Sequence, residues 1–413
     1  MDESGLTVSH GIITSLLILS VCTSVRLCVL YLYLFLGDLA FGAPFGMINA
    51  ARDAAPVAMK HEAAIANYGN SGSKTAENPV CDVVEIPAVK ILNERGEFSS
   101  SLGVLPPRWR PFLRRFVPWF TQRNVSVENV AGMSIAAVSR RLANPTDRTD
   151  LLAKLQQGKD DEGKPMGREE LTAEAQTQMI AGSDTTSKCV KLRFLFLKVL
   201  PNRHFSSSCA ITYYLARNPS VQTKLQKELD DIFGPLPSST DVDEILIPTH
   251  EQIKALPYLQ AVINETLRLH STSGVGLPRV VPEGGMTVLG KTFPEGAVLS
   301  VPTYSLHRNP EAWGDDVDQF RPERWIDGHI DHSEMMKSFN PFSFGPRYFK
   351  HLPSQDGFST YSSFKRACIG RHFAMMELQI FVAAIFRRYE FVLEKPDKNV
   401  GPHSLCCFML YFG

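Results

Sequence analysis

The sequence predicts a mainly α-helical fold with a small β region. Strand-like pieces are short and lie between Gly and Pro residues. Of the 413 residues, 44% are hydrophobic and 21% are charged, which is the composition of an ordinary globular protein with a packed core. Five stretches repeat apolar residues at three- and four-residue spacing, as amphipathic helices do: 124–143, 168–180, 210–233, 253–270 and 371–389.

The first element in chain order is an apolar stretch at residues 11–36. At 1.5 Å per residue in a helix, its 26 residues are long enough to cross a bilayer core of about 30 Å. Arg26 in its middle opposes insertion, so two interpretations stay open: a membrane anchor, or a buried helix that leads into residues 37–42. A cleaved signal peptide is disfavoured because Asp2 and Glu3 precede the stretch.

The helical stretches follow, with turns and short strands between them. A charged, Gly-containing loop at 157–167 connects the first two helices. Two strands are expected around PEGG and PEG turns, at Met286–Leu289 and Ala297–Pro302. The stretch 371–389 closes the helical part of the chain.

Charge and cysteine content exclude several classes of protein. Lys and Arg together number 43, and Asp and Glu also number 43, so the chain lacks the basic excess of a nucleic-acid-binding protein. Its eight cysteines include no Cys-x-x-Cys pair, which argues against a disulfide scaffold and a zinc ribbon.

Four motifs of the chain carry chemistry. Phe342 to Arg347 reads FSFGPR, and Arg366 to Arg371 reads RACIGR. Within the latter, Cys368 stands at the start of an amphipathic helix, where backbone amides favour a thiolate that could ligate a metal. Taken alone, the same cysteine could instead be an inert core residue.

The other motifs are weaker when each is taken alone. Ala181 to Thr186 reads AGSDTT, in which Asp184 and Thr185 could form a proton relay or could simply cap a helix end. Glu265 and Arg268 lie on one helix face, and Arg324 follows in the aromatic loop FRPERW at 320–325.

In this order the motifs resemble the cytochrome P450 superfamily of haem-thiolate monooxygenases. The resemblance covers about residues 37–398 and implies the P450 fold, here incomplete at both ends. It also implies haem b as cofactor, dioxygen as co-substrate, and electrons from NADPH through a cytochrome P450 reductase. A location on the cytosolic face of the endoplasmic reticulum membrane is implied as well.

The resemblance assigns roles to individual residues. Cys368 would be the axial ligand of the haem iron, with Phe342 and Gly370 beside it. Arg279, Arg366 and Arg347 would pair with the haem propionates. Asp184 and Thr185 would deliver protons to the distal oxygen. Glu265, Arg268 and Arg324 would form a buried structural cluster, and the substrate would be contacted by Thr272, Ser273 and Val275.

Within the superfamily, three strings are most similar to the fungal benzoate 4-monooxygenases. They are DLAFGAPFG at 38–46, HSTSGVGLPR at 270–279 and PEGGM at 282–286. This similarity implies para-hydroxylation of benzoate or a related small aromatic acid. Another substrate class, such as a secondary metabolite, is the alternative.

The chain also departs from the family pattern. Inserts near 188–205 and 348–366 interrupt the distal helix and the cysteine loop, and Pro201 in the first would break a helix. The family's early β strands and its haem-contacting Trp-x-x-x-Arg helix have no counterpart, and residues 399–413 form an atypical tail. We hypothesise that the inserts and both ends are unspliced introns or errors of the gene model, which sequencing the transcript would decide.

These departures leave two further interpretations beside the monooxygenase. One is a non-catalytic remnant that keeps the fold and binds haem poorly. The other is a membrane-anchored helical interaction protein that shares the motifs by chance. A haem spectrum separates the first of these from an enzyme, and capture of a partner would support the second.

Overall fold

The computed structural model divides into two compact units, and each is described here by itself. One unit comprises residues 18–192 and 410–413, and the other comprises 1–17 and 193–409. The residues that the structure describes are 6–8, 37, 40–43, 45, 47, 52–68, 82–103, 105–144, 149–159, 162–186, 207–234, 248–328, 332–343 and 368–393.

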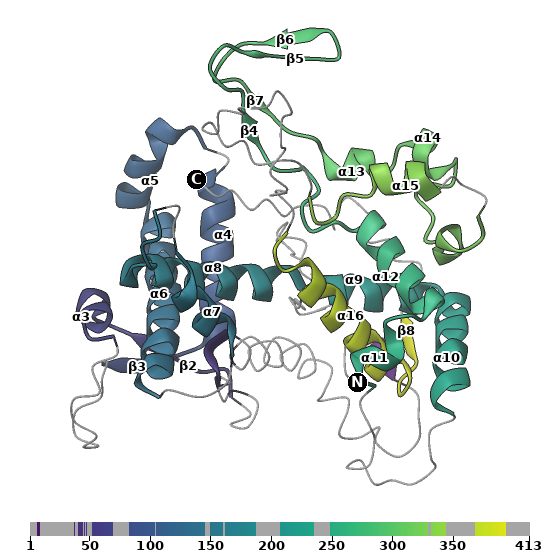
Figure 1. The fold of residues 1–413 in the computed structure, drawn as a ribbon, viewed down its shortest axis with the longest axis horizontal. Coiled ribbons are helices and arrows are strands. Elements are labelled where there is room, and N and C mark those ends of the chain that lie inside the picture. The colour runs from purple at the N-terminus through teal and green to yellow at the C-terminus, as the bar shows by residue number, and fades with distance from the viewer. Residues whose placement is uncertain are drawn as a thin grey trace. The chain divides into compact units, whose positions relative to one another are not determined.

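The unit of residues 18–192 is built around one long helix, α6 (Pro118–Ala143). Helices α4 and α5, strand β2 and helix α8 all contact α6 (Figure 1). The other elements are two antiparallel strands, one 3₁₀ turn and five helices: β2 (Ala55–Ala58), β3 (Val83–Ile86), Pro107–Trp109, α3 (His61–Ala66), α4 (Ala88–Gly103), α5 (Arg110–Phe116), α7 (Leu151–Gln157) and α8 (Arg168–Thr186).

The sequence of α6 explains its central place. Pro118 occupies the first turn, where its missing N–H has no helical partner to lose. Val130, Met133 and Val138 of this helix are fully buried against the neighbouring elements. Near the end of the helix, Arg141 is buried with Asp150, and the two form an ion pair of 2.5 Å between Nε and Oδ2. Asp150 also caps α7 by accepting the backbone N–H of Ala153.

The unit that contains residues 193–409 holds most of the predicted motifs. Its described elements are eight α helices, one 3₁₀ turn and six strands: α9 (Ser207–Arg217), α10 (Pro219–Phe233), α11 (His250–Ile253), α12 (Pro257–Leu269), α13 (Thr303–Leu306), α14 (Pro310–Trp313), Pro322–Trp325, α15 (His332–Ser338), α16 (Arg371–Phe386), β1 (Leu6–Val8), β4 (Arg279–Val280), β5 (Met286–Val288), β6 (Lys291–Phe293), β7 (Val298–Leu299) and β8 (Phe391–Leu393).

Helices α9, α10, α11, α12 and α16 enclose the core of this unit (Figure 1). Each contributes aliphatic side chains from one face, as their amphipathic spacing requires. Fully buried examples are Leu225 of α10, Val262 of α12, and Val382 and Phe386 of α16. Burial of this apolar face, rather than helix propensity, stabilises helices of this length.

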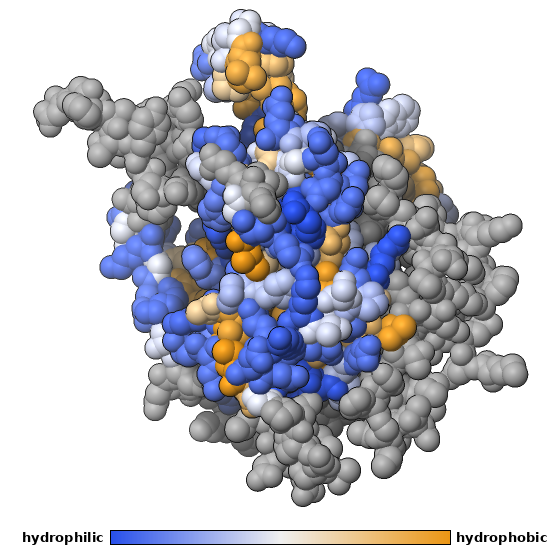
Figure 2. Space-filling view, turned by 90° about the vertical axis from the view of Figure 1, so that its right-hand side faces the viewer, coloured by the Kyte–Doolittle hydropathy of each residue, from blue (hydrophilic) through white to orange (hydrophobic). Residues whose placement is uncertain are grey.

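The strands form small two-stranded antiparallel sheets, with β1 beside β8, β4 beside β7, and β5 beside β6. The β5–β6 hairpin turns at Leu289 and Gly290, and both residues have a positive φ. Leu289 is 97% exposed, and the hairpin shows hydrophobic surface at the top of Figure 2.

The mainly helical fold with a small β content is confirmed, and several predicted boundaries are wrong. The expected helix 210–233 is two helices that meet at Asn218, since Pro219 begins α10. The expected helix 253–270 starts only at Pro257, after the short helix α11. The last helix ends at Phe386 instead of residue 389. Proline at the first turn of a helix explains the first two differences.

Some predictions fall outside the described residues. The apolar stretch 11–36 and the inserts near 188–205 and 348–366 lie there, as does the tail 399–413. Within the described part of the chain, none of the helices combines the length and the apolar character needed to cross a bilayer. The domain boundaries at residues 36 and 398 stay predictions.

Candidate functional site

Cys368 lies exposed just ahead of α16, so the interpretation that it is a buried core residue is wrong. Gly370 is the N-cap of this helix, which places the thiol beside the positive end of a helix of 16 residues. A Cβ at Gly370 would meet the Cys368 Sγ at 3.9 Å. Glycine therefore keeps the space beside the sulfur open.

The two halves of the interrupted cysteine motif meet in the structure. The backbone N–H of Cys368 donates to the carbonyl of Phe342, with an N to O distance of 2.8 Å. The guanidinium of Arg371 lies over the Phe342 ring, 5.8 Å from its centroid. Ser343, with a φ of +57°, turns the chain sharply directly after Phe342. A backbone hydrogen bond thus joins Phe342 and Cys368, the residues on either side of the interrupted motif.

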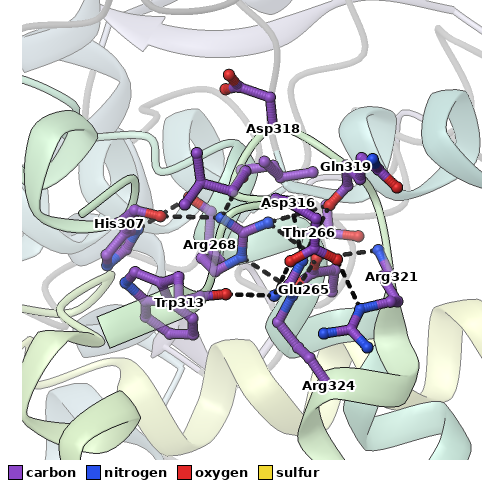
Figure 3. A network of polar contacts seen from close by, with 12 residues as sticks. Glu265, Thr266, Arg268, His307, Trp313, Asp316, Asp318, Gln319, Arg321 and Arg324 are labelled. Carbon is purple, nitrogen blue, oxygen red and sulfur yellow. Dashed lines mark hydrogen bonds and ion pairs between the residues drawn. The ribbon is translucent and has the colours of Figure 1, made fainter. Parts of the chain in front are cut away.

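Glu265 forms the centre of a buried polar network with Arg268 and Arg324, and all three side chains are fully buried (Figure 3). Arg268 binds the carboxylate through two parallel hydrogen bonds of 2.9 Å, from Nε and Nη2. Arg324 Nε donates to Oε1 at 3.0 Å, and the Trp325 indole donates to Oε2 at 3.0 Å. The structure thus brings together three residues that lie up to 59 positions apart.

Arg268 also binds three backbone carbonyls of the segment that follows α13. Arg268 Nη1 donates to the carbonyls of His307 and Val317, at 2.9 and 2.7 Å. Arg268 Nη2 donates a second bond to the Gln319 carbonyl at 3.1 Å, so all five N–H groups of this guanidinium are used. Because every N–H donor of Arg268 has a partner, these hydrogen bonds offset the cost of removing the ion pair from water.

His307 joins this network to the segment before the cysteine loop. It is fully buried, and its two ring nitrogens each lie within hydrogen-bond distance of a backbone group: Nδ1 is 2.9 Å from the Arg268 carbonyl, and Nε2 accepts the Asn340 N–H at 2.8 Å. Burial lowers the pKa of the imidazole to about 3, so the ring is neutral near neutral pH.

The predicted substrate segment is fixed against the strand β7 and the helix α13. Ser300 Oγ donates to the Val275 carbonyl at 2.9 Å, and the Tyr304 N–H donates to the Gly274 carbonyl at 2.8 Å. Thr272 and Ser273 are half-buried, and Val275 is exposed. Arg279 begins β4, is half-buried, and donates from Nη1 to the carbonyl of Pro278 at 2.9 Å.

The predicted proton-relay pair lies on α8, in the other unit. The Thr185 hydroxyl donates to the Ala181 carbonyl at 2.8 Å, one turn earlier in the same helix. The side chain of Asp184 is outside the described part of the structure, and so are Arg347 and Arg366.

Sequence analysis missed several residues of the site. His307 and Asn340 carry no signal of their own in the sequence, because their contact spans 33 positions. Trp325 could have been found, since it ends the FRPERW string that supplies Arg324. Glu377 of α16 was also missed, and burial raises its pKa to about 8.

Comparison with known protein families gives one match, to the family described as Cytochrome P450. It covers residues 205–348 and 352–406. These residues include Cys368, the Glu265 network and His307.

Individual relatives agree with this match. Benzoate 4-monooxygenase bphA of Aspergillus niger is 41% identical over 368 residues, which are 87% of this chain and 58% of the relative. Cytochrome P450 monooxygenase atr2 of Stereocaulon alpinum is 26% identical over 358 residues, 87% of this chain and 55% of the relative. Putative cytochrome P450 CYP13A6 of Caenorhabditis elegans is 35% identical over 198 residues, 47% of this chain and 32% of the relative. The chain thus spans less than two thirds of the length of these relatives.

Proposed function

Because this chain belongs to the cytochrome P450 family, we propose that it is a haem-thiolate monooxygenase with Cys368 as the axial ligand of the iron. The observation that carries the proposal is the exposed thiol of Cys368 at the N-terminus of α16, with its amide bonded to Phe342.

The residues around Cys368 fit a haem. The donor is a thiol, the ligand type of the P450 iron, and it lies exposed at the N-terminus of α16. The open space at Gly370 lets a flat ring approach the sulfur, whereas a side chain there would occupy that space. When bound, haem b with a thiolate ligand supplies the activation of dioxygen, using electrons that reach it from NADPH through a reductase.

The other site residues have roles that follow from their chemistry. Arg279 and Arg366 would bind the propionates, for which a guanidinium is well shaped. Asp184 and Thr185 would hold and relay protons for the reaction with dioxygen, with Thr185 Oγ1 as the last donor of this chain. For that step the Thr185 hydroxyl must release the Ala181 carbonyl that it binds in the structure. Thr272, Ser273 and Val275 would contact the substrate.

Benzoate, or a related small aromatic acid, is the proposed substrate, and para-hydroxylation is the proposed reaction. The support is the 41% identity to the benzoate 4-monooxygenase of Aspergillus niger. A reductase and a membrane location belong to the same proposal, with the apolar stretch 11–36 as the candidate anchor.

Product formation tests this proposal. The chain would be co-expressed with an NADPH-dependent cytochrome P450 reductase, supplied with benzoate, and assayed for 4-hydroxybenzoate, with the variant Cys368→Ala as the matched control. We expect product from the wild type and none from the variant. A wild type that holds haem and consumes NADPH without this product would contradict the substrate and leave another aromatic or secondary-metabolite substrate. A wild type that holds no haem would contradict the enzyme itself.

A further inference from the structure

The ring of His307 has a defined tautomer. The Asn340 N–H can only donate, so the Nε2 that receives it at 2.8 Å carries no proton. The remaining proton is therefore on Nδ1, which donates it to the Arg268 carbonyl at 2.9 Å. One neutral ring thus donates on one side and accepts on the other, linking two backbone segments.

The ring cannot easily move within this arrangement. His307 stacks on Phe339, with ring centroids 5.5 Å apart and planes inclined by 27°. Its edge meets Trp313 at 6.1 Å, and its own carbonyl accepts a hydrogen bond from Arg268 Nη1 (Figure 3). Arg268 is in turn held by Glu265. The position of the imidazole is therefore set by α12.

The link continues from the ring to the cysteine. Asn340 lies two residues before Phe342, and the Phe342 carbonyl accepts the N–H of Cys368. Fixing the Asn340 amide thus fixes the short segment that ends at this carbonyl. A chain of hydrogen bonds and two peptide units connects the Glu265–Arg268 pair to the backbone of Cys368.

We propose that His307 is a positioning residue for Cys368, acting through the bond from the Asn340 amide to its Nε2. This inference rests on the proposed function, since the thiol needs exact placement only if it ligates iron. Ligand groups must be held to within about 0.5 Å of their working geometry, and the groups behind them provide that precision. Arg268 fixes the position of the His307 ring. The ring in turn fixes the Asn340 amide and the segment that ends at Phe342.

Two substitutions of His307 separate the two sides of the bridge. In His307→Gln, the side-chain oxygen reaches the position of Nε2 and can still accept the Asn340 N–H, whereas the bond to the Arg268 carbonyl is lost. In His307→Asn, the shorter amide can donate to the Arg268 carbonyl and cannot reach Asn340. Both variants bury an amide in place of the ring, so a purely structural role predicts similar effects.

Two readouts are taken on both variants and on the wild type. The first is the carbon monoxide spectrum of the reduced haem-loaded chain, which reports whether the thiolate is bound. We expect the Gln variant to keep the thiolate-ligated band and the Asn variant to retain haem about tenfold more weakly, the size of a typical effect of groups behind a ligand. The second is hydrogen exchange of the Asn340 and Cys368 amides in the haem-free chain, which we expect to be up to about tenfold faster in the Asn variant.

A matched control is Tyr258→Phe, which removes the hydrogen bond from the phenol to Glu323 in the same unit and leaves the contacts of His307 unchanged. It leaves the Asn340 amide in place, so the thiolate-ligated band should persist. Equal haem retention and equal amide exchange in the Gln and Asn variants would overturn the proposal, and so would loss of thiolate ligation in Tyr258→Phe. If the wild type itself binds no haem, the proposed function fails, and the exchange rates alone decide whether the bridge exists.

Discussion

Glu377 lies in α16, nine residues after Cys368, and is buried. Neither of its carboxylate oxygens has a hydrogen-bond partner within the described ranges. Burial raises the pKa of the carboxyl to about 8 because the charged form loses its hydration. The folded state therefore favours the protonated acid.

This burial predicts a pH-dependent stability. An unperturbed Glu in the unfolded chain has a pKa of about 4.3. Because the pKa in the folded chain is higher, the contribution of Glu377 to the free energy of unfolding is fully present below a pH of about 4.3 and is lost as the pH rises to about 8. We expect Glu377→Gln to be more stable than the wild type at pH 8.5, by on the order of 4–5 kcal/mol, and to differ by about 1 kcal/mol or less at pH 5. Urea unfolding at both pH values measures this, and an equal difference at both would contradict the predicted ionisation.

Arg268 is the residue on which most of the buried network depends. The change Arg268→Lys removes the two-fold bond to Glu265 and leaves the carbonyls of Val317 and Gln319 with fewer donors. We expect a loss of about 3–5 kcal/mol in the free energy of unfolding, as for other broken buried pairs. In contrast, Lys254→Ala breaks the exposed pair with Glu251 and should leave the free energy of unfolding nearly unchanged. Similar losses for both variants in urea unfolding would count against the network.

At the scale of elements, the segment between α12 and β4 depends on one glycine. Gly276 has a φ of +75°, and a Cβ there would lie 2.0 Å from the backbone carbonyl oxygen of Val301. No backbone carbonyl can move that far without displacing β7. Glycine is therefore required at position 276 for two reasons: a side chain would clash with Val301, and the backbone has a positive φ.

We expect Gly276→Ala to destabilise the chain by more than about 2 kcal/mol, since it combines a clash with an unfavourable φ. Gly290→Ala is the matched control, because Gly290 has nearly the same φ of +76° and a Cβ there would meet nothing within 4 Å. We expect Gly290→Ala to lower the free energy of unfolding by only about 1 kcal/mol. Thermal unfolding of the two variants compares them, and equal shifts would show that the contact with Val301 is unimportant.

Helix positions were predictable from apolar spacing, and the errors came from proline. Pro219 and Pro257 each start a helix inside a stretch whose periodicity continues across them. Apolar spacing reports which residues face the core, and it does not record a change of direction when both helices bury the same face. The strand at Met286 was found from its turn residues, but its partner β6 was not, because pairing depends on the hairpin register.

At the scale of the whole molecule, the insert near 348–366 leaves the two ends of its loop in contact. Between Phe342 and Cys368 the chain has 25 residues, and removing 348–366 would leave six. The entropy of closing a loop changes by only about 0.6 kcal/mol for each doubling of its length. A long insert is therefore compatible with the observed bond between these two residues.

The deletion of residues 348–366 tests whether the insert is dispensable. The deletion removes Arg366 and leaves Arg347 two residues before Cys368, where it can replace the lost guanidinium. We therefore expect the shortened chain to keep thiolate ligation and to gain about 1 kcal/mol of stability, the amount set by two halvings of the loop. The carbon monoxide spectrum and urea unfolding of both chains measure the two effects. Loss of ligation in a folded shortened chain would indicate that the insert itself holds the cysteine in place.

Apolar spacing in the sequence predicted the mainly helical fold class, because it marks the helix faces that the core buries. The resemblance of the motifs to the P450 family predicted a buried cluster of Glu265, Arg268 and Arg324, and the structure brings these three residues together with their side chains buried. The role of Cys368 as iron ligand stays a prediction. The sequence could not predict the bridge through His307, since that depends on backbone amides and on residues 33 positions apart. Tertiary contacts, rather than residue types, decide this feature.

The absorption spectrum of the purified chain, reduced and exposed to carbon monoxide, tests the central claim most directly. We expect the Soret band of a thiolate-ligated haem, and we expect Cys368→Ala to lose it while the chain stays folded. A folded wild type that takes up haem without this band, or takes up none, would contradict the assignment of Cys368 as the iron ligand.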